Sequence, residues 1–308
     1  MSNILVEDGD RNFSPGGAYN NYDDGFDGVG IRTFSKLPYS KELRKGLDVI
    51  VAGVPFDAMT EARPGMRFGP TGIRAAYIGN TCSPDLNVAT IEEINAIDWG
   101  DIPVDNTDIE GSLGSIEKHF SEFIQTGSVP VILGGDPSIT QAEIRGTGLT
   151  PALIHFGAHQ TAVTEGVDTE HSIQVGPTEN SVYDQENIIT SVQAHDLGID
   201  GTARAIRQKA GASQVFVTFD IDFLDPAYAP GTGTPECEGF TTWEALELIR
   251  KSLLGLDIIG FDLVNVNPSY DNDEVTCMAA ARIAFEFMSI IACRKAGICS
   301  YKGFSAGM

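Results

Sequence analysis

Continuous apolar runs separated by amphipathic stretches are the main pattern along this chain. Strands that are buried on both faces have unbroken apolar runs, and helices between successive strands are typical of a parallel sheet. We therefore predict an α/β fold, with a mostly parallel sheet covered by helices on both faces. The predicted strands are residues 47–54, 94–99, 129–133, 152–156, 214–219 and 258–266. The predicted helices are residues 111–126, 201–210 and 242–254.

Short polar motifs follow five of the predicted strands. Ligands of parallel sheets bind beyond the carboxyl ends of the strands, which lie at one edge. We therefore expect the five motifs to converge on one site. They are Pro55-Phe56-Asp57, Gly134-Gly135-Asp136, Gly157-Ala158-His159, Asp220-Ile221-Asp222 and Asn265-Val266-Asn267.

Asp220 and Asp222 stand at the end of the strand at 214–219. Residues two apart on a strand point the same way, so these two carboxylates are expected to share one face. Asp225-Pro226 then turns the chain away. Two neighbouring buried carboxylates repel each other unless a cation or a shared proton compensates. A divalent metal site is the usual reason for such a pair.

Length and composition favour one large domain. The 308 residues show no composition break, so we expect an irregular N-terminal extension at 1–29 and a single domain at 30–308, although the Gly, Asn and Asp-rich composition continues to residue 45. No apolar run approaches the roughly 20 residues that span a bilayer, and the N-terminus lacks a secretory signal pattern. Five scattered cysteines form no C-x-x-C pair. We expect a cytoplasmic protein.

The net charge of −23 restricts the partners. Phosphate binding needs a basic face, so we expect no nucleic acid and no anionic membrane partner. An acidic surface steers cationic small molecules toward a site. It serves equally well for solubility or for a salty environment, so the charge by itself does not identify a substrate.

At these motifs the chain resembles the ureohydrolase family, which includes arginase, agmatinase and guanidinobutyrase, and it is most similar to the agmatinase-like branch. The resemblance covers roughly residues 30 to 290 in the family's order. The matching segments are G-I-R-T-F-S-K-L-P, V-A-G-V-P-F-D, R-P-G-M-R-F-G-P-T-G-I-R, D-W-G-D-I-P, L-G-G-D-P-S, H-F-G-A-H, F-D-I-D-F-L-D-P, P-G-T-G-T-P and D-L-V-N-V-N-P. The resemblance implies a three-layer α/β/α sandwich and homo-oligomers, trimers or hexamers. It also implies two manganese ions that activate a bridging hydroxide to attack a guanidinium carbon and release urea.

The resemblance further implies six metal ligands, of which this chain keeps three. His159, Asp220 and Asp222 match. Pro137 stands in place of a histidine, and Gly157 and Thr161 stand in place of two aspartates. Proline and glycine offer no side-chain donor, and a threonine hydroxyl is a weak neutral ligand. We therefore do not expect the usual two manganese ions.

The three retained residues allow two interpretations. One imidazole and two carboxylates suit a single manganese, zinc or nickel ion completed by water. Alternatively His159, Asp220 and Asp222 bind no metal, and one of the two aspartates has a raised pKa and serves as a general acid or base.

Further candidate residues come from the resemblance and from their place near the site. His171 lies where the family keeps a histidine for proton transfer, and Asn265 replaces an acidic residue that holds substrate. Cys237 follows the P-G-T-G-T-P-E loop; it is either a nucleophile with His171 as base or a small half-buried filler. Gln160 and Asp225 complete the predicted substrate pocket.

Three hypotheses for function follow. The first is a divergent enzyme acting on a guanidino, amidino or related C–N substrate through Asp220, Asp222, His159 and His171, without the paired manganese. The second is an inactive family member that serves as a regulatory or scaffold subunit, in some assemblies beside a homologous active chain. The third is an ordinary agmatinase-like amidinohydrolase.

Overall fold

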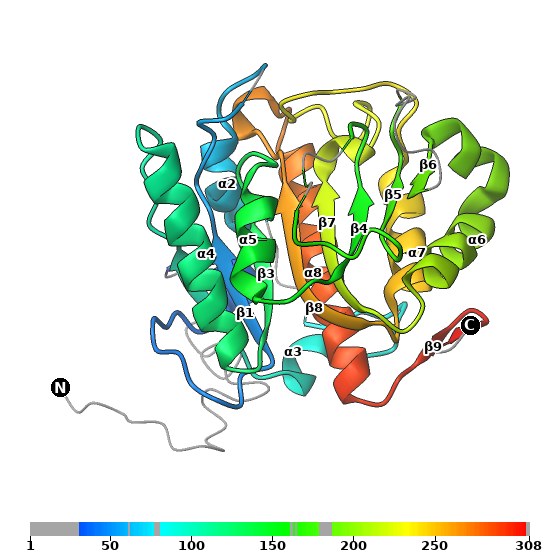
Figure 1. The fold of residues 1–308 in the computed structure, drawn as a ribbon, viewed down its shortest axis with the longest axis horizontal. Coiled ribbons are helices and arrows are strands. Elements are labelled where there is room, and N and C mark those ends of the chain that lie inside the picture. The colour runs from blue at the N-terminus through cyan, green and yellow to red at the C-terminus, as the bar shows by residue number, and fades with distance from the viewer. Residues whose placement is uncertain are drawn as a thin grey trace.

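An eight-stranded sheet forms the centre of the molecule, with the strand order β2-β1-β3-β8-β7-β4-β5-β6 (Figure 1). The computed structural model describes residues 31–60, 62–76, 81–160, 163, 165–178 and 187–305. Every pairing within this sheet is parallel. The α/β prediction is therefore confirmed. The predicted extension at 1–29 and the predicted ligand position Thr161 lie outside the described residues.

The six predicted strands are present, with ends that shift by at most two residues. Two short strands, β5 and β6, were missed because two or three residues carry no readable period. The strands of the sheet are β1 (Val49–Gly53), β2 (Ala96–Asp101), β3 (Val129–Leu133), β4 (Ala152–Phe156), β5 (Ile173–Val175), β6 (Ile188–Ile189), β7 (Gln214–Asp220) and β8 (Asp257–Val264). A separate hairpin near the C-terminus pairs β9 (Ser300–Tyr301) with β10 (Phe304–Ser305).

Helices cover both faces of the sheet and make three layers. Side chains alternate along a buried strand, so Ile50 and Ala52 of β1 pack on one face while Val49 and Val51 pack on the other. The first face is covered by α4 (Ile109–Gln125) and α5 (Ile139–Thr147). The second face is covered by α2 (Gly69–Ala76), α3 (Thr90–Glu93), α6 (Ser191–Ala210), α7 (Thr242–Leu253) and α8 (Val275–Lys295).

The helix predictions were correct at α4 and α7 and incomplete at α6. Helix α6 begins ten residues earlier than predicted, because Thr190 and Gln193 form a capping box at its start. Gly198, with a φ of 66°, interrupts its regular geometry and hid the first turns from the periodic pattern.

Helix α8 is long and apolar enough to cross a membrane, and it is the one described helix with that property. Within the fold, 83% of its most apolar window is buried. It packs against α2, α3 and α7 and against the sheet. A helix that is apolar on all sides is typical of a core element, and its lack of an amphipathic period explains why it was not predicted.

Candidate functional site

The candidate site lies at the carboxyl end of β7, where two acidic side chains are buried. Strand β7 ends at Asp220, and Asp222 lies in the following 3-10 turn, η5 (Ile221–Phe223). The Asp220 carboxylate accepts a hydrogen bond from the Asp222 backbone N–H at 2.9 Å. The argument from strand alternation was therefore wrong for Asp222: a turn capped by Asp220, and not a shared strand face, brings the two acids together.

Asp222 is held by His159 and by neighbouring donors. The Nδ1 atom of His159 lies 2.8 Å from Asp222 Oδ2. The same carboxylate accepts the Ala158 backbone N–H at 2.9 Å and the Thr234 hydroxyl at 3.1 Å. The Asp222 side chain is fully buried, while that of His159 is 42% exposed. Of the two predicted partners, Asp222 is thus a buried acid and His159 is a histidine that is partly open to solvent.

Asn265 joins the two carboxylates. Its amide nitrogen lies 2.9 and 3.1 Å from the two oxygens of Asp220 and 3.2 Å from Asp222 Oδ2. Its Oδ1 atom accepts the Gly233 backbone N–H at 3.0 Å. The backbone of Asn265 adopts a φ of 69°, in the left-handed region that asparagine tolerates better than most residues. Asn265, predicted as a pocket residue, therefore contacts the acidic pair directly.

A buried imidazole occupies the space beside Gly157. A Cβ atom added at Gly157 would lie 2.5 Å from His155 Nε2 and 3.2 Å from the Asp220 Cβ. His155 is buried, and its Nδ1 atom has no hydrogen-bond partner among the described residues. Burial lowers the pKa of His155 to about 4, so this ring is neutral near pH 7.

The pKa values of two further groups in the site are raised, for different reasons. Burial, reinforced by the charge of Asp222, raises the pKa of the Asp220 carboxyl well above its usual range. The hydrogen bond to Asp222 raises the pKa of His159, and burial opposes this only in part. Among the described residues, no lysine or arginine forms an ion pair with Asp220 or Asp222. Amide, hydroxyl and imidazole groups surround the two acids instead.

Glu236 is a member of the site that the sequence interpretation missed. Its Oε1 atom lies 3.5 Å from His159 Nε2, on the side of the ring away from Asp222. Glu236 follows Pro235 in the loop next to Cys237, so its place in the P-G-T-G-T-P-E segment was the available signal. Acidic groups therefore flank His159 on both sides.

His171 lies away from this group. Strands β4 and β5 pair with Ile154 opposite Ile173, so His171 precedes β5 at the amino-terminal edge of the sheet. Its Nδ1 atom lies 2.7 Å from Asp168 Oδ2. His159, in contrast, follows β4 at the carboxyl edge. The geometry thus separates His171 from the site, and we do not retain it as a proton-transfer residue or as a base for Cys237.

The remaining predicted positions lie around the site without joining the acidic pair. Asp225 accepts the Ala227 backbone N–H at 2.9 Å and stabilises the turn after η5. Gln160 and Cys237 are exposed, which excludes the half-buried filler role for Cys237. Pro137 is exposed next to Asp136, a buried acid that accepts the Met59 backbone N–H at 3.0 Å. Within the described part of the chain, no group of three or more His, Cys, Asp or Glu side chains has the arrangement of a metal site.

Comparison with known proteins finds one family and several close structures. The model of the arginase family matches residues 47–172 and 160–289. An agmatinase of Chromobacterium violaceum is 36% identical over 293 residues, which cover 87% of this chain and 90% of that protein. A crystal structure of a hypothetical agmatinase from Burkholderia thailandensis has a TM-score of 0.81 at 33% identity, over 88% of this chain and 93% of that one. The proclavaminate amidino hydrolase of Streptomyces clavuligerus also has a TM-score of 0.81, at 32% identity, over 86% of this chain and 98% of that one.

Proposed function

Because this chain belongs to the arginase family, we propose that it acts on a small guanidino, amidino or related C–N compound, and that it does so without a paired manganese centre. The observation that carries this proposal is that uncharged side chains occupy the space around Asp220 and Asp222. Asn265 donates to both acids, and His155 occupies the space next to Gly157.

The position of Asn265 supports the loss of the metal centre. A metal ion is bound by lone pairs of carboxylate oxygens. Here the amide N–H group of Asn265 points at three of the four oxygens of Asp220 and Asp222. An amide nitrogen is a donor and cannot ligate a cation, so the hydrogen bonds of Asn265 occupy carboxylate oxygens that an ion would otherwise bind.

Gly157 supports it independently. The family resemblance implies a bridging aspartate at this position, but glycine has no donor atom. The imidazole of His155 lies 2.5 Å from the place that a Cβ would take. Restoring a carboxylate at position 157 would therefore require His155 to move as well. The described residues do not fit a pair of metal ions, and we derive no catalytic step from such ions.

The chemistry left to the site is proton transfer by His159. With Nδ1 hydrogen-bonded to Asp222, its Nε2 atom faces the open side of the site. There it can take a proton from water as the water oxygen bonds to the amidino carbon. It can then return that proton to the leaving nitrogen as the C–N bond breaks. The acidic side chains at positions 220, 222 and 236 favour a cationic substrate.

One contact favours the second hypothesis, a non-catalytic subunit. Glu236 lies 3.5 Å from His159 Nε2, so both ring nitrogens face acids. A histidine held between two carboxylates is kept protonated and is a poorer base. The Glu236 side chain is 44% exposed, so a cationic substrate can displace it from His159. The enzyme hypothesis depends on that displacement.

Metal analysis and one substitution test the proposal. Protein purified without chelator is analysed for metal and then assayed for urea, ammonia or amine release from a panel of guanidino and amidino compounds, with and without EDTA. We expect turnover that survives EDTA and falls at least about 100-fold in Asp222→Asn, with Glu117→Gln on the exposed face of α4 as control. Two equivalents of manganese with EDTA-sensitive turnover would establish the ordinary agmatinase-like reaction instead. No turnover of any compound, with intact folding, would favour the non-catalytic subunit.

A further inference from the structure

A second pair of buried acids lies outside the candidate site. Glu143 belongs to α5 and Asp262 belongs to β8, and both side chains are fully buried. Glu143 lies one turn of α5 after Thr140, whose hydroxyl is 2.7 Å from Asp262 Oδ2, so its side chain lies on the face of α5 that meets Asp262, and the two acids interact. Neither belongs to the proton-transfer chemistry proposed above.

The hydrogen bonds of the pair are incomplete when both acids are ionised. Thr140 of α5 donates its hydroxyl to Asp262 Oδ2 at 2.7 Å. The other oxygen of Asp262 and both oxygens of Glu143 are buried and, among the described residues, receive no hydrogen bond. Two ionised carboxylates can only accept, whereas one added proton makes an O–H···O bond between them. A single proton would therefore satisfy oxygens that otherwise stay unpaired.

Among the described residues, the contacts of the pair include no lysine or arginine. From β7, Thr218 lies beside Asp262, and on β3 the residue opposite Asp262 is Ile132. Helix α4 faces α5 with the Phe120 side chain and the Glu117 carbonyl. The remaining charged groups beside α5 point outward, where Arg145 and Glu165 form an exposed ion pair at 3.5 Å. Burial first, and the charge of Asp262 second, raise the pKa of Glu143 well above its usual range. Burial likewise raises the pKa of Asp262 to about 6.

We propose that Glu143 and Asp262 share one proton, and that this hydrogen bond holds α5 against β8 in a pH-sensitive way. This contact is connected to the candidate site through the segments that follow β3 and β8. Helix α5 follows the 134–138 loop, and Asn265, three residues after Asp262, donates its backbone N–H to the Gly135 carbonyl at 2.8 Å. Loss of the proton places two like charges between the helix and the strand, and the folded protein becomes less stable as the pH rises.

The direction of the effect follows from proton linkage. In the unfolded chain Glu143 loses its proton near its ordinary value of 4.5, while in the folded protein the pair keeps the proton to higher pH. Above about pH 6, where Asp262 has ionised, the folded state therefore binds one more proton than the unfolded state. The unfolding equilibrium constant rises about tenfold per pH unit until the folded pair ionises.

Substitution of Glu143 by glutamine tests the shared proton. Glu143→Gln keeps an N–H donor for Asp262 but has no titratable proton. Above about pH 6, we expect the unfolding equilibrium constant of Glu143→Gln, measured by urea denaturation, to rise about tenfold less per pH unit than that of the wild type. Glu117→Gln on the exposed face of α4 removes the same charge and should keep the wild-type slope. An unchanged slope in Glu143→Gln overturns the proposal.

Infrared spectroscopy gives a second readout. It is recorded in an Asp220→Asn background, because the raised pKa of Asp220 would give a similar band. At neutral pH we expect this protein to show the C=O stretch of a protonated carboxylic acid, shifted by deuterium exchange. Adding Glu143→Gln should remove the band while circular dichroism shows a folded protein. An Asp220→Asn protein without this band, or a double variant that retains it unchanged, contradicts the shared proton.

Discussion

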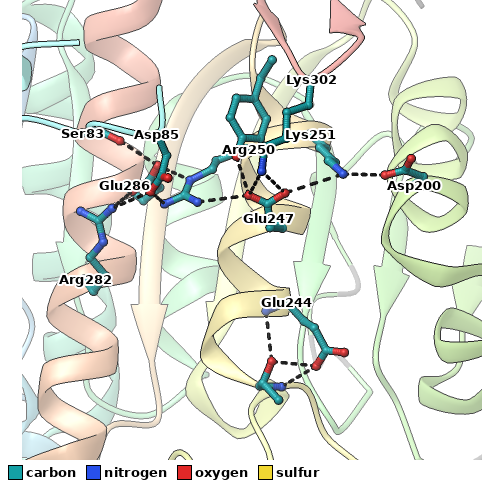
Figure 2. A network of polar contacts seen from close by, with 12 residues as sticks. Ser83, Asp85, Asp200, Glu244, Glu247, Arg250, Lys251, Arg282, Glu286 and Lys302 are labelled. Carbon is teal, nitrogen blue, oxygen red and sulfur yellow. Dashed lines mark hydrogen bonds and ion pairs between the residues drawn. The ribbon is translucent and has the colours of Figure 1, made fainter. Parts of the chain in front are cut away.

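Buried acids gather both at the candidate site and in a polar network between α7 and α8, and their partners differ. In the network, Glu286 receives Arg250 Nε at 2.8 Å and Arg282 Nη2 at 3.0 Å (Figure 2). Glu247 receives Lys302 at 2.9 Å, Arg250 at 3.3 Å and the Tyr301 hydroxyl. At the site, Asp220 and Asp222 are held by the Asn265 amide, the Thr234 hydroxyl and His159.

The difference in partners suggests different roles for the two groups of acids, one in stability and one in function. Acids with arginine and lysine partners are compensated within the chain, and this network ties the C-terminal hairpin and α8 to α7. Asp220 and Asp222 lack such partners, so part of their charge is left for a ligand to neutralise. Burial without a cation costs stability and is accepted where it prepares binding or proton transfer. The pattern of partners, more than the burial itself, distinguishes Asp220 and Asp222 from the acids of the network.

The largest effect is expected when the network loses its central cation. Arg250→Ala leaves Glu286 and Glu247 buried with fewer donors and should lower the free energy of unfolding by about 3–5 kcal/mol, measured by urea denaturation. Lys118→Ala breaks the exposed Lys118–Glu122 pair and should cost less than about 0.5 kcal/mol. Equal losses in the two variants would contradict the structural role of the network.

The site should resist an added side chain. Gly157→Ala places a Cβ 2.5 Å from His155 Nε2 and should lower the free energy of unfolding by about 1–3 kcal/mol. In Gly114→Ala the new methyl group meets nothing within 4 Å, so this helical control should be neutral or stabilising. If His155 is the obstacle, Gly157→Ala should lower the free energy of unfolding by less when it and the Gly114→Ala control are made in a His155→Ala background. An undiminished loss there would assign the strain elsewhere.

Acid should weaken the network at Glu247. Burial opposes ionisation of Glu247, but hydrogen bonds from Tyr301 and Lys302 outweigh it and lower the pKa of this carboxyl. A depressed acid pKa contributes stability above its ordinary value of 4.5, and that contribution is lost as the pH falls through the folded value. Glu247→Gln should therefore cost about 1–2 kcal/mol at pH 7, and the difference from wild type should shrink below pH 4.5. A difference that is constant with pH would show that lost packing, and not charge, is the cause.

The smallest effect on stability is expected at Asp220. Asp220→Asn removes a buried acid without a cation, whose ionisation is opposed by burial and by Asp222, so the free energy of unfolding should stay within about 1 kcal/mol of wild type or rise. Glu286→Gln is the matched change in the network and should be clearly destabilising. Chemical denaturation of both variants at one pH decides the comparison, and an Asp220→Asn loss as large as that of Glu286→Gln would remove the distinction between the two regions.

Much of the fold was readable from local patterns. Apolar runs located six strands, because a strand that is buried on both faces of a sheet consists almost entirely of apolar residues. Helix α8 escaped prediction because a helix apolar on all sides has no period. Within the site, the converging motifs identified Asp220, Asp222, His159 and Asn265, since strand ends of a parallel sheet meet at one edge. His171 was misplaced because β5 was not predicted, so nothing in the local pattern showed that this residue precedes a strand.

By itself, the sequence determined the family and the parallel sheet, because residue identity and local periodicity are properties of the chain alone. It also places Pro137 and Gly157 where the family resemblance implies metal ligands. Only the tertiary structure decided what fills the changed positions. The Asn265 amide reaches across to the two acids, His155 lies against Gly157, and Glu143 faces Asp262. These contacts join residues from different strands, turns and helices, and their distances depend on how the layers pack.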